Sequence, residues 1–441
     1  MSLLLPHNLA MSASRGGNVP GWVKSLARPY GIVQPVLAVD PYGGRYFRGD
    51  AKVDQVSAIN TSRAGSAFML GDGAYQTFAT NEPPSILGVG LDVYRQIAPL
   101  LYSSADMTVG TYWTASNGAT VKDTMAPDGT TNATTFTEDT STGFHGFVGN
   151  NPNRPSGVAG TKYTAYACVG KGQTRRYVIL WWGTGGEGVL ATLDTQTGTI
   201  TECVVTGGDY TIDACGVEDA GAAWRVWTTG SKATGFSGGV IVPVLRGAIA
   251  PVGNGSAPAY LGDGSTIIVW DFNLVAADFL PPPNPTGASL TPRYATTVTD
   301  PDFPSLVSAF GLDGGFRVGA RVAFERLSAG NARCVWAAGE DADNHARLDI
   351  STANTAKFTL RKAAVDVLVM ESGAFAAIGE KDIFVVAKDG AWLLEVTGVP
   401  GDADNGVYGL PDLADFRYGS NFGDTDYFNG TMQNLVLGRA A

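Results

Sequence analysis

Five side chains in the first half of the chain have the chemistry that a sugar-binding surface needs. Aromatic faces stack on the C–H groups of a pyranose ring, while a few fixed polar groups hold its hydroxyls. Adjacent tryptophans on one strand point to opposite faces of the sheet, so at most one lies in the inner core and the other is the better candidate for exposure. The candidate carbohydrate-binding residues are Tyr112, Trp113, His145, Trp181 and Trp182, and the alternative place for each is a sheet core.

An acidic stretch, "GEDADNHARLD" at 339–349, places oxygen ligands close together in the chain. Asp341, Asp343 and Asn344, next to Glu340, are the weak candidates for a calcium site, because calcium prefers carboxylate and amide oxygens. The stretch lacks the spacing of a 12-residue calcium loop, so a solvated acidic turn is the other interpretation. The same two interpretations apply to "NFGDTDYFNG" at 421–430. We expect no other cofactor.

The sequence offers little for catalysis. Its three histidines, at 7, 145 and 345, are far apart along the chain, and no GxSxG, HExxH or P-loop motif is present. A glycosidase needs only two carboxylates, which the 41 acidic residues do not exclude. The periodic repeats of a β-helix depolymerase are absent. We expect that the protein is not an enzyme.

Charge and hydropathy exclude further classes. The net charge of −11 and the lack of an extended basic run argue against a nucleic-acid ligand. The N-terminus lacks the features of a secretory signal, and no apolar stretch is long enough to predict a membrane span. Cys168, Cys203, Cys215 and Cys334 predict buried thiols rather than a disulfide framework, which fits synthesis in a reducing cytosol.

The elements that must position these residues are strands. The 58 glycines and short alternating runs such as "KYTAYACVG" and "RRYVILWWG" predict an all-β protein. We expect an extended N-terminal segment with a short hairpin at 1–100, β-sandwiches at 101–280 and 303–441, and a proline-rich linker at 281–302. The alternating "IVWDFNLV" at 268–275 predicts a half-buried strand that ends one sandwich, since prolines 281–283 cannot extend a sheet. Asp389 and Gly390 predict a two-residue hairpin turn with φ > 0 at both positions.

Several phrases, taken in order, resemble those of carbohydrate-binding-module-like domains in phage virion proteins. The leader carries Ser62, Arg63 and Ala64, then Asp72 and Gly73, then Asn81, although "GLDVYRQIAPLLYSS" lacks the usual Thr-Asn. The domain itself shows "APDGTTNATTFTED", "GTKYTAYACVGKG", "GAAWRVWTT" and "GDGSTIIVWDFNLVAADFLPPPNPTGASLTPR". The last block, with "AKDGAWLLEVTG" and "YFNGTMQNLVLG", is similar to concanavalin-like and laminin-G-like jelly rolls.

The resemblance implies a virion protein of a tailed phage or phage-derived particle, such as a tail fibre, a head spike or a receptor-binding protein. Its N-terminal segment would bind other virion proteins, and its sandwiches would bind polysaccharide on the host cell surface. We expect a homo-oligomer, since proteins of this family are commonly trimers. We expect neither a nucleic-acid ligand nor insertion into a membrane. The alternatives are a decoration protein that binds no sugar and a polysaccharide-degrading enzyme. Head and tail attachment stay equally open.

Overall fold

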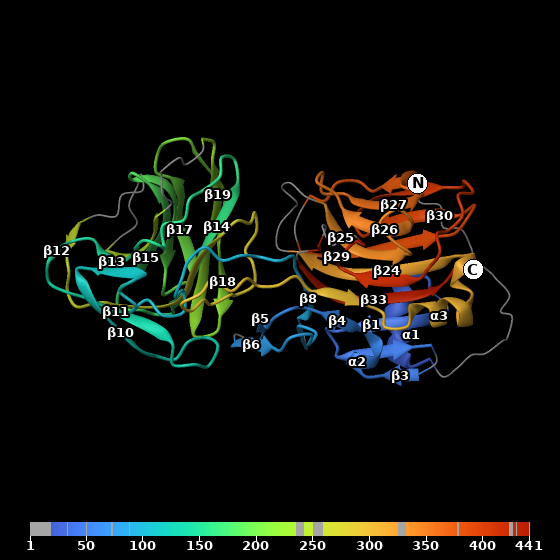
Figure 1. Ribbon diagram of the computed structural model, residues 1–441, viewed down its shortest axis with the longest axis horizontal. Coiled ribbons are helices and arrows are strands. Elements are labelled where there is room, and N and C mark those ends of the chain that lie inside the picture. The colour runs from blue at the N-terminus through green and yellow to red at the C-terminus, as the bar shows by residue number, and fades with distance from the viewer. Residues whose placement is uncertain are drawn as a thin grey trace.

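The computed structural model describes residues 19–32, 34–49, 51–71, 74–87, 89–234, 242–249, 259–324, 332–376, 379–422, 427–428 and 430–440. Two lobes lie side by side (Figure 1): the middle of the chain builds one, and both ends of the chain build the other. Each lobe contains two large antiparallel sheets. The predicted all-β class is therefore confirmed.

The lobe formed by the middle of the chain, here the inserted sandwich, contains two six-stranded sheets. One follows the order β10 (Gly118–Thr124), β11 (Ala133–Glu138), β22 (Thr266–Val275), β14 (Lys162–Gly170), β19 (Ala223–Lys232) and β18 (Tyr210–Ala220). The other follows the order β17 (Thr199–Val205), β16 (Glu187–Asp194), β15 (Tyr177–Thr184), β20 (Val242–Ala248), β13 (His145–Gly149) and β9 (Trp113–Ser116). A small separate sheet pairs β12 (Thr142–Gly143) with β21 (Tyr260–Leu261). Phe147, Leu180 and Val226 are fully buried in the main core of this lobe.

The other lobe, here the terminal sandwich, has a ten-stranded and a seven-stranded sheet. The ten-stranded sheet runs β3 (Ala51–Val53), β2 (Arg45–Arg48), β1 (Pro35–Asp40), β33 (Gly430–Arg439), β24 (Phe316–Phe324), β29 (Gly379–Ala387), β30 (Trp392–Val396) and β31 (Val399–Asp404), with β7 (Ser85–Ile86) and β8 (Gly90–Val93) attached at β33. The other runs β28 (Val365–Glu371), β27 (Ala356–Lys362), β26 (His345–Ile350), β25 (Arg333–Gly339), β32 (Asp415–Tyr418), β23 (Thr297–Thr299) and β4 (Asn60–Ser62). Trp336 and Phe358 lie in the core of this lobe.

Residues 35–93 do not form an extended segment, which corrects the prediction for this part of residues 1–100. Strands β1 and β8 pair with β33, and β4 pairs with β23, so both ends of the chain share the same sheets. The short strands and scattered prolines concealed this, because these strands find their partners at the far end of the sequence. The predicted short hairpin is present as β5 (Ala67–Gly71) and β6 (Ala74–Phe78).

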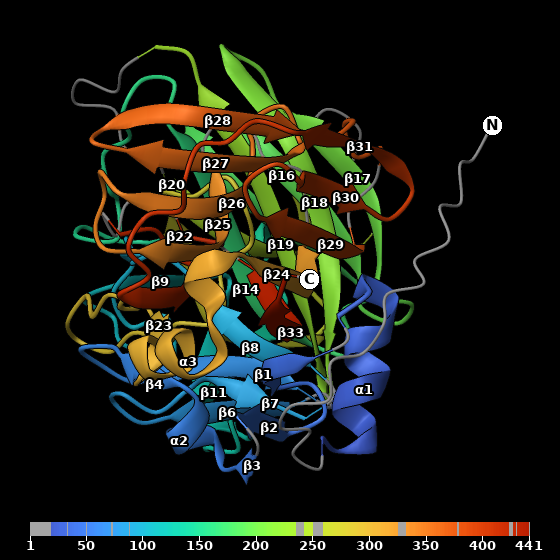
Figure 2. The same ribbon diagram turned by 90° about the vertical axis from the view of Figure 1, so that its right-hand side faces the viewer.

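Few residues are helical among those described. Helix α1 (Gly21–Ala27) and the 3-10 turn η1 (Arg28–Tyr30) come before the first strand, and α1 lies beside the ten-stranded sheet (Figure 2). Val23, Ala27 and Tyr30 form one buried cluster with Phe47 and Val436 of this sheet. The other helical segments are α2 (Gln55–Ala58), α3 (Phe303–Phe310) and η3 (Leu312–Gly314).

Two linkers join the sandwiches and run antiparallel to each other. Bridges join Ile97 to Arg293 and Pro99 to Val275. The buried guanidinium of Arg293 lies 2.6 Å from the buried carboxylate of Asp92 and donates a hydrogen bond to the carbonyl of Phe68. The prolines at 281–283 form no strand, as predicted, but they are buried, and Arg225 donates a hydrogen bond to the carbonyl of Pro281. The proline-rich linker is therefore packed against the rest of the protein.

In the middle of strand β22, the alternation of its side chains between the two faces of the sheet is interrupted. Asp271 has φ of 47°, and the register with β14 shifts at this point. Before this bulge Ile267 and Val269 face the main core, whereas after it Phe272 and Leu274 do. The half-buried strand predicted at 268–275 is therefore wrong, because the bulge turns Trp270 to the other face and residues 269–275 are all buried.

The hairpin of β29 and β30 is confirmed, and its register places Asp389 and Gly390 at the turn. Only Gly390, with φ of 75°, has a positive φ, whereas the sequence predicted this at both positions.

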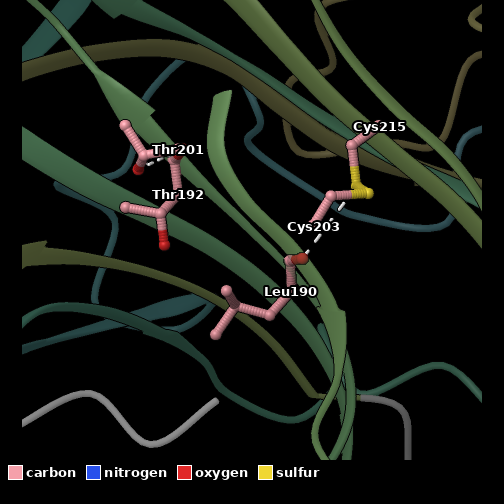
Figure 3. The surroundings of a disulfide bond; sticks show 5 residues. All are labelled: Leu190, Thr192, Thr201, Cys203 and Cys215. Carbon is pink, nitrogen blue, oxygen red and sulfur yellow. Dashed lines mark hydrogen bonds between the residues drawn. A yellow bond between two sulfur atoms is a disulfide. The ribbon is translucent and has the colours of Figure 1, made fainter. Parts of the chain in front are cut away.

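The cysteines divide into two kinds. Cys168 and Cys334 are buried thiols outside any disulfide, as predicted. The same prediction is wrong for Cys203 and Cys215, which form a disulfide between β17 and β18 (Figure 3). These strands are edge strands of different sheets, so the bond joins the two layers of the inserted sandwich.

Candidate functional site: a groove beside Tyr112

A groove of about 470 Å³ opens on the inserted sandwich between the incoming linker, the β10–β11 hairpin and the outgoing linker. Its volume lies within the range of small-molecule sites. Side chains from all three segments reach it, including Asp106, Tyr112, Lys122, Asp128 and Asn132, together with residues 285–288. The groove thus contains an aromatic ring, charged groups and backbone groups.

The ring of Tyr112 is held in place by its surroundings. It stacks on Tyr102 with the ring centroids 5.3 Å apart and the planes 8° from parallel. The buried side chain of Asn153 fixes Tyr102, since it accepts the backbone N–H of Tyr102 at 2.6 Å and donates to its carbonyl at 2.9 Å. The hydroxyl of Tyr112 donates to the carbonyl of Ala288 at 3.4 Å. A ligand would therefore meet a preorganised tyrosine.

Asp106 and Lys122 form an ion pair in the groove, with 3.1 Å between the carboxylate and the ammonium group. Asp106 also accepts hydrogen bonds from the backbone N–H and the hydroxyl of Thr108, at 3.1 and 2.6 Å. Burial alone would raise the pKa of Asp106, but the hydrogen bonds from Thr108 and Lys122 hold that pKa below its ordinary value. Asp106 is consequently ionised at neutral pH.

Asp128 lies in the turn of the β10–β11 hairpin. Its Oδ1 accepts the backbone N–H of Thr130 at 2.9 Å and the Thr130 hydroxyl at 2.6 Å. Asn132 donates to the same hydroxyl at 2.7 Å. Asp128 makes no ion pair with any residue that the structure describes. The turn thus presents a carboxylate and an amide to the groove in fixed positions.

Tyr112 is the one sequence candidate that lines the groove. Its neighbour Trp113 is buried in the main core, where it stacks on Phe272 and donates from its indole N–H to the carbonyl of Ser103 at 3.0 Å. The ring nitrogens of His145 lie 2.6 and 3.3 Å from the carbonyl oxygens of Asn117 and Tyr260, and the residue is fully buried. Trp113 and His145 are therefore internal.

Trp181 and Trp182 lie on opposite faces of β15, as the sequence predicts. Trp182 is fully buried between the sheets, near Tyr163 and Tyr210. Trp181 lies on the outer face but is only 8% exposed, since it packs with Ile179 and other apolar side chains. Neither indole offers an open face of the size that a pyranose ring covers.

The calcium candidates form a turn between β25 and β26. The carboxylate of Asp341 accepts the backbone N–H groups of Asp343 and Asn344 at 2.8 and 2.9 Å and the Asn344 side chain at 3.2 Å. These bonds hold the pKa of Asp341 below its ordinary value. Asp341 acts here as the cap of a solvated turn. In the second acidic stretch, 423–426 and 429 lie outside the described residues.

Among the described residues of the inserted sandwich, the largest ionic cluster lies away from the groove. Arg175 binds Glu138 through two hydrogen bonds of 2.8 and 2.6 Å and Asp263 through one of 2.9 Å, and the Tyr260 hydroxyl donates to Glu138. Glu138 and Arg175 are buried, so this cluster ties strand ends together. Over the described part of the chain, no group of three His, Cys, Asp or Glu side chains is arranged to hold a metal ion.

Sequence reasoning missed Asp106, Lys122 and Asp128. The "APDGTTN" phrase signals a turn, and an Asp two residues before Thr130 is typical of a side chain that caps a turn. That signal locates the carboxylate on a hairpin tip. It does not reveal that two linkers lie beside it, because residues 285–288 are more than 150 positions away.

Comparison with known proteins does not assign the chain to a family. No protein-family model matches the sequence, and no curated protein matches it. No described helix is long and apolar enough to cross a membrane.

Solved β-proteins show partial similarity. The NanB sialidase of Streptococcus pneumoniae is 12% identical, with 29% of this chain and 22% of its own covered and a TM-score of 0.25. The CBM40 domain of the Ruminococcus gnavus IT-sialidase is 11% identical, with 29% and 78% covered and a TM-score of 0.26. Mouse laminin α1 domains LG4-5 are 8% identical, with 64% and 82% covered and a TM-score of 0.23. At these values the similarity carries no conclusion about ligand or activity.

Proposed function

We propose that the protein is a non-enzymatic virion component of a tailed phage or phage-like particle, and that the inserted sandwich binds host surface polysaccharide in the groove beside Tyr112. The observation that carries the sugar-binding part is the groove itself, in which a preset tyrosine lies beside fixed carboxylate, amide and backbone groups. Its support on the virion side is the ordered sequence resemblance to phage proteins.

The chemistry of the groove fits a sugar. The Tyr112 ring offers a face for pyranose C–H groups, and Asp128 and Asn132 offer acceptors and a donor for hydroxyls. A partly open groove on the surface of a sandwich also suits an internal segment of a polymer. Affinity for one such segment would be modest, and several copies of the protein on one particle would raise it by avidity.

Asp106 does not suit the role of the general acid in glycoside hydrolysis. A general acid for this reaction needs a carboxyl group whose pKa is raised, so that it holds a proton at the working pH. The ion pair with Lys122 and the bonds from Thr108 instead keep the pKa of Asp106 low. This favours binding without cleavage.

We propose that the N-terminal segment attaches the protein to the particle as part of the terminal sandwich. The N-terminal segment was expected to form this contact as an extended arm, but residues 35–93 contribute strands to both sheets of the terminal sandwich. Any anchoring by this segment would therefore act through a folded lobe. We expect a homo-oligomer in the particle, with a trimer as the first state to test.

The test is binding of purified protein to host cells with and without their surface polysaccharide. Tyr112→Ala should lower the affinity about two- to tenfold, because an aromatic contact contributes ~0.5–1.5 kcal/mol beyond the area it buries. Tyr177→Ala is the matched control, since Tyr177 is a half-buried tyrosine outside the groove. Equal binding of wild type and Tyr112→Ala would overturn the site. Equal binding to cells with and without the polysaccharide would favour a decoration protein. Release of sugar fragments from the polysaccharide would favour an enzyme.

A further inference from the structure

The charges in the groove indicate which sugars it accepts. Three side chains that line it are charged, namely Asp106, Lys122 and Asp128. Lys122 is already neutralised, because its ammonium group lies 3.1 Å from Asp106. One negative charge, on Asp128, is left without an ionic partner among the described residues.

The position of this charge is fixed. One oxygen of Asp128 is occupied by the two hydrogen bonds from Thr130, so the hairpin turn orients the whole carboxylate. A fixed carboxylate does not need to be ordered by the ligand, and this preserves most of its interaction with a cation. Burial raises the pKa of Asp271, and the negative charge of Asp128 adds a smaller effect in the same direction.

We infer that the groove selects glycans that carry a protonated amino group and rejects glycans that carry a carboxylate. This inference rests on the proposed function, because it assigns a ligand class to the same groove. A protonated 2-amino sugar would place its ammonium group beside Asp128 while its ring lies on Tyr112. A uronic or sialic acid would bring a further carboxylate into a groove in which Lys122, the one cation among the described lining residues, is already paired, on a chain of net charge −11.

The test compares three oligosaccharides of equal length by calorimetry: a glucosamine oligomer, its fully N-acetylated counterpart and a galacturonic acid oligomer. The wild type should bind the glucosamine oligomer about two- to fivefold more tightly than the N-acetylated one, as a solvent-exposed ion pair predicts. The galacturonic acid oligomer should bind most weakly. Added salt should reduce the preference for the amine.

Two variants test the charge without removing the tyrosine. Asp128→Asn retains an oxygen that can accept the Thr130 hydrogen bonds, so the turn is kept while the preference for the amine should disappear. Lys122→Gln leaves Asp106 unpaired and should increase the same preference. Equal affinity of the wild type for the amine and the N-acetyl oligomers, or an unchanged preference in Asp128→Asn, would overturn the inference.

The outcome separates this inference from the proposed function. If Tyr112→Ala weakens binding of every oligomer and the wild type does not prefer the amine, the groove binds sugar but does not select by charge. If no oligomer binds, the selection for amino sugars is refuted, and the host-cell assay decides separately whether the groove is a sugar site at all. If the galacturonic acid oligomer binds more tightly than the glucosamine oligomer, the groove prefers carboxylate sugars and the inference is refuted.

Discussion

Asp271 shows how much one residue in this fold depends on its environment. It is fully buried in the bulge of β22, where its carboxyl group accepts hydrogen bonds from the backbone N–H of Asn284 at 3.2 Å and from the Ser104 hydroxyl at 3.3 Å. It thereby joins the strand to both linkers. Burial raises the pKa of Asp271 to about 7, and the nearby charge of Arg225 only partly opposes this.

A raised pKa in the folded state makes stability depend on pH in a defined direction. Asp271 holds its proton in the folded protein up to about pH 7, whereas in the unfolded chain it loses the proton near pH 4. Its contribution to stability is therefore complete below pH 4 and is lost as the pH rises to 7. We expect Asp271→Asn, which cannot titrate and tolerates positive φ, to remove this loss. Urea unfolding at pH 4.5 and 7.5 measures the difference between variant and wild type.

The control for this prediction is Asp139→Asn. Asp139 is an exposed turn residue whose pKa is lowered by hydrogen bonds from Ser141, so its replacement should not remove the loss of stability between pH 4 and 7. Identical pH dependence of Asp271→Asn and wild type would show that the buried carboxyl is not the titrating group.

Single residues were the hardest feature to predict from the sequence. Of the five candidate residues, Tyr112 lines the groove, whereas Trp113, His145 and Trp182 are internal. The sequence shows residue type and alternation, and exposure depends in addition on what covers each face. Trp181 illustrates this, because it points away from the core and is still covered by neighbours on the outer face.

At the scale of elements, short alternating runs sufficed to predict strands and the hairpin at Asp389 and Gly390. The bulge in β22 was not predictable, because nothing in "IVWDFNLV" marks Asp271 as the residue with positive φ. The pairing of Cys203 with Cys215 was missed for a related reason. Their separation of 12 residues fits a simple hairpin equally well, whereas the two strands belong to different sheets.

This disulfide should stabilise the inserted sandwich by restricting its unfolded chain. Closing a loop of this length contributes ~3 kcal/mol to the free energy of unfolding in the chain-entropy treatment. We expect the double variant Cys203→Ser, Cys215→Ser to lose about this amount, measured by urea unfolding. Reduction of the wild type should reproduce the loss, while the reductant should leave the double variant unchanged. A wild type that is equally stable with and without reductant would contradict the prediction.

At the scale of the whole molecule, the phrases that resemble phage proteins include residues that build the joint between the lobes. Arg63 is buried and donates hydrogen bonds to the carbonyls of Gly65 and Ala79, which hold the β5–β6 hairpin. Arg293, from the final "TPR", binds Asp92, from "GLDVY", and the carbonyl of Phe68 in the same hairpin. These motifs are therefore structural, and they explain how one sandwich can be inserted into another without disturbing it.

The insertion predicts which fragments of the chain can fold. The two pieces of the terminal sandwich approach each other at the linkers, where the backbone N–H of Arg293 donates to the carbonyl of Ile97 at 2.9 Å and Thr296 donates to Tyr94 at 3.1 Å. Residues 19–98 joined to 292–441 by an Asn-Gly turn should therefore fold without the inserted sandwich, since the join closes a two-residue hairpin.

Residues 297–441 alone should not fold cooperatively. They lack β1 and β8, which pair with β33, and β4, which pairs with β23, and so they expose strand edges and core that are buried in the complete lobe. Circular dichroism and urea unfolding of the joined protein and of this fragment make the comparison. A cooperative transition of the same midpoint in both would show that the N-terminal strands contribute nothing to the sandwich, and would restore the interpretation of residues 1–100 as a separate arm.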